Sequence, residues 1–200
     1  MTPLPVSQTT ARVADPGPLG LAAFALTTFV LSVFNAGLVG GAAQPVVLGL
    51  ALFYGGLVQV AAGVVEFFRN NLFGALAFCS YGGFWLAYWH IGAHPEFFES
   101  AAPGLKAQGV GVFLLGWTIF TAYMLIAVSR VNIGLTVTFA LLFIAFVALT
   151  AGDLAGAAGA TRLGGWFGLG AALAAWYCSF AGVFNSTAGR TVLPLGPRRS

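Results

Sequence analysis

Long apolar runs alternate with short polar breaks along the whole chain. Each run has about 20 residues, the length that an α-helix needs to cross the hydrocarbon core of a membrane. The breaks contain residues that favour turns and loops: Gln44-Pro45, Arg69-Asn70-Asn71, His94 to Lys106, Ser129-Arg130 and Asp153 to Arg162. We therefore predict six spans, at about 19–39, 46–67, 72–91, 109–128, 131–151 and 163–184.

The composition agrees with a chain that lies mostly in lipid. Of its 200 residues, 59% are hydrophobic and 6% are charged, whereas soluble domains carry about 25% charged residues. The 28 glycines favour close approach between membrane helices. Eight Lys and Arg residues are too few for a nucleic-acid-binding surface, so no nucleic acid is expected as a partner. These features predict an all-α integral membrane protein, multi-pass in a lipid bilayer.

The basic residues predict the orientation, because cytoplasmic loops are the richer in Lys and Arg. With the N-terminus inside, only Lys106 and Arg162 face out. The cytoplasmic set is Arg12, Arg69, Arg130, Arg190, Arg198 and Arg199. We expect both termini in the cytoplasm, with an N-terminal segment 1–18, a six-helix membrane domain 19–186 and a C-terminal tail 187–200.

The first two spans each carry polar residues on one helical face. In the first span this face contains Phe24, Thr27, Thr28, Leu31 and Asn35. Threonine hydroxyls often bond back to the preceding turn, but an amide in lipid needs a partner. Asn35 therefore either joins helices or donates to a substrate carboxylate. In the second span the face contains Gly55, Gln59, Gly63 and Glu66, where glycines permit close packing or leave room for a small polar solute beside Gln59.

Glu66 is the only acid within reach of the membrane core, and Arg69 follows at helix-pair spacing. The two form an interfacial ion pair, or the acid guides anions or handles protons at the mouth of a pore. In the third span Tyr81, Trp85 and Tyr88 share a face. Such a stripe serves packing or an interfacial belt, although the mid-membrane phenol of Tyr81 also suits the lining of a pore.

The sequence gives little support for metal binding or catalysis. His90 and His94 have a zinc-ligand spacing, and Glu96 or Glu99 could add a third ligand. Pro95 is expected to end the helix there, so an outer-surface cap is favoured and no metal is expected. No phosphate-binding loop, zinc-protease motif or nucleophile elbow occurs. We therefore expect neither an enzyme nor a cofactor.

Several blocks resemble the acetate uptake transporter family, which includes the bacterial succinate–acetate permeases. The family signature before the first span is Asn-Pro-Ala-Pro-Leu-Gly-Leu, and this chain has Asp15-Pro16-Gly17-Pro18-Leu19-Gly20-Leu21. Further matching blocks are Tyr54-Gly55-Gly56-Leu57-Val58-Gln59, Ser80-Tyr81-Gly82-Gly83-Phe84-Trp85 and Gly189-Arg190-Thr191-Val192-Leu193-Pro194. The resemblance implies six helices per subunit, a homohexamer in the cell (inner) membrane, and uptake of acetate, other short monocarboxylates and sometimes succinate through each protomer.

The resemblance also implies roles for single residues. Phe24 and Tyr81 match two members of a hydrophobic constriction. Its third member is a leucine. Alignment backward from the C-terminal side places this leucine at Leu142, and alignment forward from the N-terminal side places it at Phe139. Thr27, Asn35 and Gln59 match polar positions along the route, and the pathway residues also include Thr28.

Two positions depart from the signature, with Asp15 in place of Asn and Gly17 in place of Ala. An ionised Asp only accepts hydrogen bonds and repels an entering carboxylate, although it still caps the helix start.

The sequence leaves the transport mode open. No positive charge lies deep in the spans, and a bare carboxylate would meet a large desolvation cost. The anion must therefore keep some water, bind amides and helix N-termini, or cross as the neutral acid, so proton-linked and channel-like flux both remain. Two rivals are a channel for another small anion or a neutral solute, and a membrane scaffold protein without transport.

Overall fold

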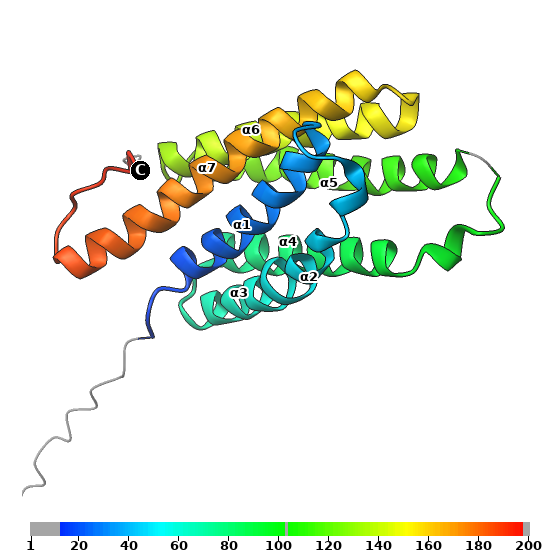
Figure 1. Cartoon of the computed structure of the whole chain (residues 1–200). Coiled ribbons are helices and arrows are strands. Elements are labelled where there is room, and N and C mark those ends of the chain that lie inside the picture. The colour runs from blue at the N-terminus through cyan, green and yellow to red at the C-terminus, as the bar shows by residue number, and fades with distance from the viewer. Residues whose placement is uncertain (1–12, 103, 198–200) are drawn as a thin grey trace, which may run out of the picture.

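A computed structural model describes residues 13–102 and 104–197, and every regular element of that part is a helix (Figure 1). Arg12, Arg198 and Arg199, and with them most of segment 1–18, lie outside the described residues. The long elements are α1 (Gly17–Asn35), α2 (Val46–Leu52), α3 (Gln59–Phe68), α4 (Leu72–Ala93), α5 (Leu105–Val128), α6 (Ile133–Ala155) and α7 (Ala158–Ala188). Short turns η1 (Gly41–Ala43), η2 (Phe53–Val58) and η3 (Pro95–Phe98) complete the order.

Most of these helices have the length and composition of membrane spans. Five segments qualify among the described residues: Gly17–Asn35, Gly41–Phe68, Leu105–Val128, Ile133–Ala155 and Ala158–Ala188. Helix α4 has 22 residues, but its Tyr, Trp and His side chains make it less apolar. Phe68, Leu72 and Ile126 are 73–75% exposed, which suits a surface that faces lipid. The protein is thus a multi-pass helical membrane protein.

Helices that follow one another in the chain pack together, and α1 also packs against the distant helix α7. Helix α1 crosses the bundle along α7, α6 lies between α5 and α7, and α3 packs on α4 (Figure 1). Gly165 and Gly168 on α7 allow the close crossing, because a Cβ at Gly165 would strike the backbone of Ala36 and one at Gly168 would strike Ser32. The α1–α7 interface therefore depends on two glycines.

The second expected span is a helix with an irregular centre. Its middle turn, η2, is a π-helix between α2 and α3, and a π-helix is a widened turn that often occurs at functional sites. A Cβ at Gly55 would lie 2.7 Å from Thr27 Oγ1, so this turn lies directly against α1. It ends at Val58, and the next residue, Gln59, begins α3.

Two predicted boundaries are wrong. The first helix ends at Asn35 rather than near Val39, because Gly37 adopts a left-handed conformation with φ 76°. The stretch Asp153 to Arg162, expected as a loop, is mostly helical, and only Gly156 and Ala157 connect α6 to α7. Its alanines favour helix, and Gly156 alone, with φ 63°, makes the turn.

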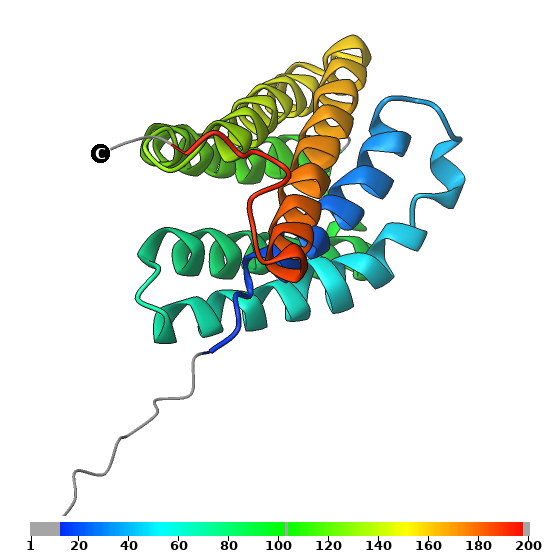
Figure 2. The same ribbon diagram turned by 90° about the vertical axis from the view of Figure 1, so that its left-hand side faces the viewer.

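The C-terminal tail folds back over the end of the bundle where α1 begins (Figure 2). Asn185 Oδ1 accepts hydrogen bonds from the backbone N–H groups of Val192 and Leu193 at 2.7 and 2.9 Å. The backbone N–H of Ile133 donates to the Gly196 carbonyl at 3.0 Å. The tail is thereby fixed against the start of α6.

Candidate functional site: two cavities and a constriction

Three side chains from three helices separate two internal cavities. Phe24 of α1, Tyr81 of α4 and Leu142 of α6 are the residues that line both cavities, and they are 6%, 3% and 5% exposed. The ring centroids of Phe24 and Tyr81 are 6.0 Å apart. Phe139 packs edge-on to Tyr81 at 5.9 Å but lines one cavity only. Leu142 therefore lines both cavities, and Phe139 does not.

A hydrogen-bond chain holds Tyr81 in place. Thr121 Oγ1 donates to the Trp117 carbonyl at 2.8 Å, which uses its only proton. The Tyr81 hydroxyl, 2.9 Å from Thr121 Oγ1, must then be the donor. The Tyr81 ring also packs edge-on against Phe120 at 5.2 Å. The mid-membrane phenol therefore has its partner within the protein, and the ring acts as a fixed wall.

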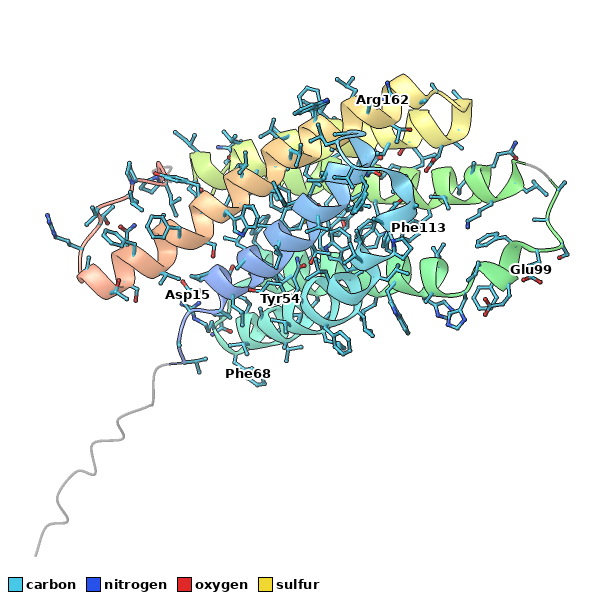
Figure 3. All side chains as sticks on the ribbon, viewed as in Figure 1. Asp15, Tyr54, Phe68, Glu99, Phe113 and Arg162 are labelled. Atoms are coloured by element: carbon cyan, nitrogen blue, oxygen red, sulfur yellow. The ribbon has the colours of Figure 1, made fainter. Side chains whose placement is uncertain are left out.

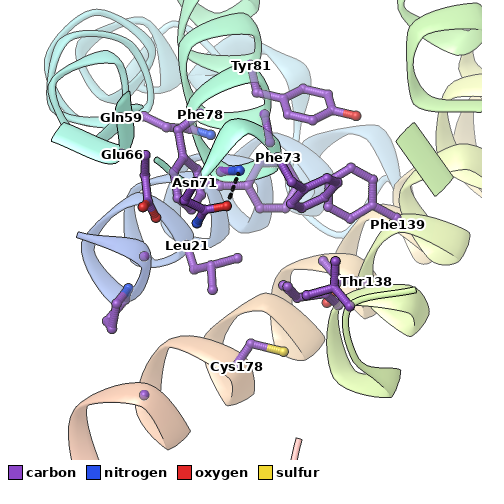
Figure 4. A pocket seen from close by; sticks show the side chains of 18 of the residues that line it. Leu21, Gln59, Glu66, Asn71, Phe73, Phe78, Tyr81, Thr138, Phe139 and Cys178 are labelled. Carbon is purple, nitrogen blue, oxygen red and sulfur yellow. Dashed lines mark hydrogen bonds between the residues drawn. The ribbon is translucent and has the colours of Figure 1, made fainter. Parts of the chain in front are cut away.

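The smaller cavity, which we call the Asp15 cavity, has a volume of about 220 Å³. Apolar rings form most of its wall, and Figure 4 shows Gln59, Glu66 and Asn71 on its polar side. Gln59 and Glu66 are each 1% exposed. Gln59 Oε1 and Glu66 Oε2 have no hydrogen-bond partner. Both atoms are acceptors when the glutamate is ionised, and of the two only Glu66 Oε2 has a charged neighbour, Arg69 Nη1 at 3.5 Å.

The larger cavity, which we call the Lys106 cavity, has a volume of about 590 Å³. Its polar lining includes Thr28, Asn35, Gln44, Tyr88, Lys106 and Asp153. Gln44 Nε2 donates to the Tyr88 hydroxyl at 3.1 Å. Thr28 Oγ1 and Trp85 Nε1 are buried without a partner, and an indole nitrogen only donates. Two residues in the wall of this cavity therefore each have a buried polar atom that can donate a hydrogen bond and has no partner.

The structure brings most predicted pathway residues together, with one exception. Gln59 and Glu66 line the Asp15 cavity, and Thr28 and Asn35 line the Lys106 cavity. Thr27 lines neither. Its Oγ1 donates to the Ala23 carbonyl at 2.9 Å within α1, and its side chain faces Gly55. Thr27 thus packs α1 against the π-helix, and its hydroxyl is bonded to the preceding turn of its own helix.

The signature segment forms one wall of the Asp15 cavity. Asp15, Gly17, Pro18 and Leu21 line it, whereas Leu19 is 47% exposed on the outer surface. The Pro16 carbonyl accepts from Gly20 N–H at 3.0 Å, and Gly20 lies under the Phe78 ring. The segment therefore shapes both the helix start and the cavity.

An ion cluster ties this segment to the end of α3. Pro16 occupies the cap position of α1, and Asp15, one residue earlier, accepts a hydrogen bond at Oδ1 from the Gly17 backbone N–H at 2.9 Å. It also lies 2.5 Å from Arg69 Nη1. The expected pair is present as well, with Arg69 Nη1 3.5 Å from Glu66 Oε2. Arg69 thus serves two acids, one of them buried.

Several lining residues carry no clear sequence signal. Thr138 and Leu135 of α6 and Leu195 of the tail line the Asp15 cavity, and nothing in their local pattern separates them from other core positions. Asn71 was identifiable as the cap of α4, since it precedes an apolar run and accepts from Gly74 N–H at 3.1 Å. Its place beside Glu66 depends on the α3–α4 turn.

The histidine pair lies at the C-terminal end of α4, and the following turn leads to Glu99, at the opposite end of the bundle from Asp15 (Figure 3). The His90 and His94 rings are 4.7 Å apart. His94 Nδ1 is 2.7 Å from Glu96 Oε1, and this hydrogen bond lowers the pKa of the exposed Glu96 carboxyl. Among the described residues no three metal-ligating side chains form a group. The pair therefore suits a surface cap.

These features define a class of protein. A multi-pass helical protein with two internal cavities that meet at a tight constriction is a membrane transport protein. Residues 1–197 match the family model of the GPR1/FUN34/yaaH family. The chain belongs to this family, which confirms the resemblance seen in its sequence blocks.

Individual relatives and a solved structure agree with this family assignment. The chain is 43% identical to accumulation of dyads protein 2 of Saccharomyces cerevisiae, covering 92% of this chain and 64% of the relative. It is 38% identical to the succinate-acetate/proton symporter SatP of Escherichia coli K12, covering 92% and 96%. The solved structure of the bacterial acetate channel SatP matches with a TM-score of 0.86 and 38% identity, over 92% of this chain and 100% of that one. The chain thus spans just under two thirds of the yeast relative. The bacterial proteins are transport proteins rather than enzymes.

Proposed function

We propose that this protein carries acetate and related short-chain carboxylates, succinate among them, across the cell (inner) membrane. The single observation that carries the proposal is the shared lining of two cavities by Phe24, Tyr81 and Leu142. A bacterial relative whose name gives succinate and acetate as its substrates supports the substrate class.

Buried polar atoms on the two sides of the constriction support an order of contacts for a passing carboxylate. Trp85 Nε1 and Thr28 Oγ1 are buried without partners on one side of the constriction. A carboxylate that sheds water there exchanges hydration for N–H and O–H donors, which limits its desolvation cost. The apolar constriction then excludes the rest of its hydration shell. Beyond it Gln59 offers an amide, and Glu66 is the acid that would hold a proton if flux is proton-linked.

The proposed topology has six spans and both termini in the cytoplasm. With α4 counted, six helical segments of 19 to 31 residues follow one another. Asp15 and Leu195 line the same cavity, which supports placing both ends of domain 19–186 on one side. Arg69, Arg130 and Arg190 lie in the loops and tail assigned to that side, which fits the excess of basic residues in cytoplasmic loops.

We also propose a homohexamer with one pathway in each protomer, as the family resemblance implies. Val112, Ile119 and Ile126 of α5 are 61–73% exposed, and such an apolar face suits either lipid or a neighbouring subunit.

Uptake of labelled acetate into proteoliposomes, with and without a pH gradient, tests the proposal. Wild-type vesicles should accumulate acetate, and a gradient dependence would indicate proton linkage. Leu142→Trp should block uptake because the larger ring fills the constriction. Leu173→Trp is the matched control, since Leu173 is 59% exposed and lines neither cavity. Vesicles that take up no acetate, propionate or succinate above empty liposomes would refute the proposal.

A further inference from the structure

The two cavities differ in the sign of the charges that line them. The Lys106 cavity has one cation, Lys106, and one acid, Asp153. The charged residues that line the Asp15 cavity are two acids, Asp15 and Glu66, and no Lys or Arg is among its lining residues. A solute that leaves the constriction on this side therefore meets carboxylates.

Arg69 offsets only part of this charge. One guanidinium lies 2.5 Å from Asp15 and 3.5 Å from Glu66, so one cation faces two acids. The side chain of Glu66 is 2% exposed, and its Oε2 has no hydrogen-bond partner. A second buried acceptor without a partner, Gln59 Oε1, lines the same cavity. The two acids differ in exposure: the Glu66 side chain is buried, whereas the Asp15 side chain is 61% exposed at the mouth of the cavity, where dissolved salt can screen its charge.

Gly17 lies directly beside the Asp15 carboxylate. A Cβ at Gly17 would lie 3.1 Å from Asp15 Oδ1 and 3.7 Å from Glu66 Oε1. The first of these contacts is tighter than an ordinary van der Waals contact. The two departures from the family signature are therefore neighbours in space, and a side chain at position 17 would require a small shift of the Asp15 carboxylate.

We propose that Asp15, together with Glu66, acts as a charge filter that favours monocarboxylates over dicarboxylates. The inference rests on the proposed function and names its substrate class. A fixed charge in a narrow path discriminates by ionic valence, and the Coulomb penalty of a dianion is twice that of a monoanion at the same distance. Acetate carries one negative charge at neutral pH, and succinate carries two. The acids should therefore weaken succinate uptake more than acetate uptake.

A charge series tests this filter at a fixed pH of 7. Asp15→Asn removes one negative charge and frees Arg69, whereas Arg69→Gln leaves both acids without their cation. The ratio of succinate uptake to acetate uptake should rise on the order of tenfold in Asp15→Asn. In Arg69→Gln the ratio should fall, so that the wild type lies between the two variants.

Matched controls place the same charge changes elsewhere. Glu99→Gln removes one acid at the opposite end of the bundle (Figure 3), and Arg190→Gln removes one exposed cation outside both cavities. Both should keep the wild-type ratio. Wild-type protein at rising ionic strength gives a measurement without any variant, because screening should raise the relative uptake of succinate.

The outcomes separate the filter from the transport function. A ratio that follows the charge series, with unchanged controls, supports the filter. Acetate uptake in every variant with one constant ratio, or a wild-type ratio that does not respond to salt, overturns the filter and leaves the transport proposal intact. Absence of carboxylate uptake by the wild type overturns both.

Discussion

The two cavities on either side of Tyr81 differ in the charged residues that line them and in the buried polar atoms that have no partner. On one side the buried polar atoms without partners are Thr28 Oγ1 and Trp85 Nε1, and on the other they are Gln59 Oε1 and Glu66 Oε2. These are all the buried side-chain atoms without a partner in the described part of the chain. An unpaired buried polar group costs about 1–3 kcal/mol. All four belong to residues that line one of the two cavities.

The difference shows how one constriction can serve an anion without any deep positive charge. Donors on the Lys106 side replace water around a carboxylate. Acceptors and acids on the Asp15 side favour a solute that brings a proton, retains water or carries a low charge. This difference between the cavities requires three features: the wall that separates them, the amide of Gln59 and the hydroxyl of Thr28. Each can be changed separately.

Removing the wall should have the largest effect. Tyr81→Ala deletes a ring that is 3% exposed and should lower the free energy of unfolding by about 3–5 kcal/mol. It should also join the cavities and admit larger monocarboxylates such as benzoate. Thermal unfolding in detergent and uptake of labelled benzoate measure the two effects.

Tyr81→Phe is the control for this wall. It keeps the ring and loses only the hydrogen bond to Thr121, so it should cost about 0.5–1.5 kcal/mol and still exclude benzoate. Exclusion of benzoate by a folded Tyr81→Ala protein would contradict the assignment of Tyr81 as the dividing wall.

Changing the amide beyond the wall should have an intermediate effect. Gln59→Leu keeps the volume but removes the amide that follows the π-helix. Because the amide nitrogen Nε2 is the part of Gln59 that can donate to a carboxylate, acetate uptake should fall about tenfold, as for loss of a hydrogen bond to a charged group. Gln108→Leu, an exposed amide of α5 outside both cavities, is the control and should transport normally. A well-assembled Gln59→Leu protein with full uptake would instead favour a scaffold role or another solute.

Much of this comparison could be foreseen from the sequence, and the reason is physical. In lipid, backbone groups must bond within the chain, so 20-residue apolar runs define helices with little ambiguity. The same rule makes Gln59 and Glu66 conspicuous. The π-turn at Phe53–Val58 was not foreseen, because a widened turn has the same apolar composition as a regular one. Its only signal was the pair Gly55-Gly56.

Contacts between distant segments were harder to predict. Leu142 and Phe139 are one helical turn apart and both apolar, so only the packing of α6 shows which one faces both cavities. Asp15 and Arg69 are separated by 54 residues, and no local pattern joins them. Thr27 and Thr28 are adjacent and chemically identical, yet one faces Gly55 and the other a cavity.

The smallest effect on uptake is expected for a change at Thr28. The sign of its effect on stability tests whether the Thr28 hydroxyl serves the solute or the packing of the helices. Thr28→Val keeps the shape but removes a hydroxyl that has no partner. Stability should stay constant or rise by about 1 kcal/mol, because an unpaired buried group is lost, while acetate uptake should fall by a factor of about three. Thr118→Val should show the opposite pattern. Thr118 Oγ1 contacts Thr150 Oγ1 at 3.0 Å outside both cavities, so its loss should lower stability and leave uptake unchanged. If Thr28→Val instead behaves as Thr118→Val is expected to, the hydroxyl serves packing and the donor side of the comparison fails.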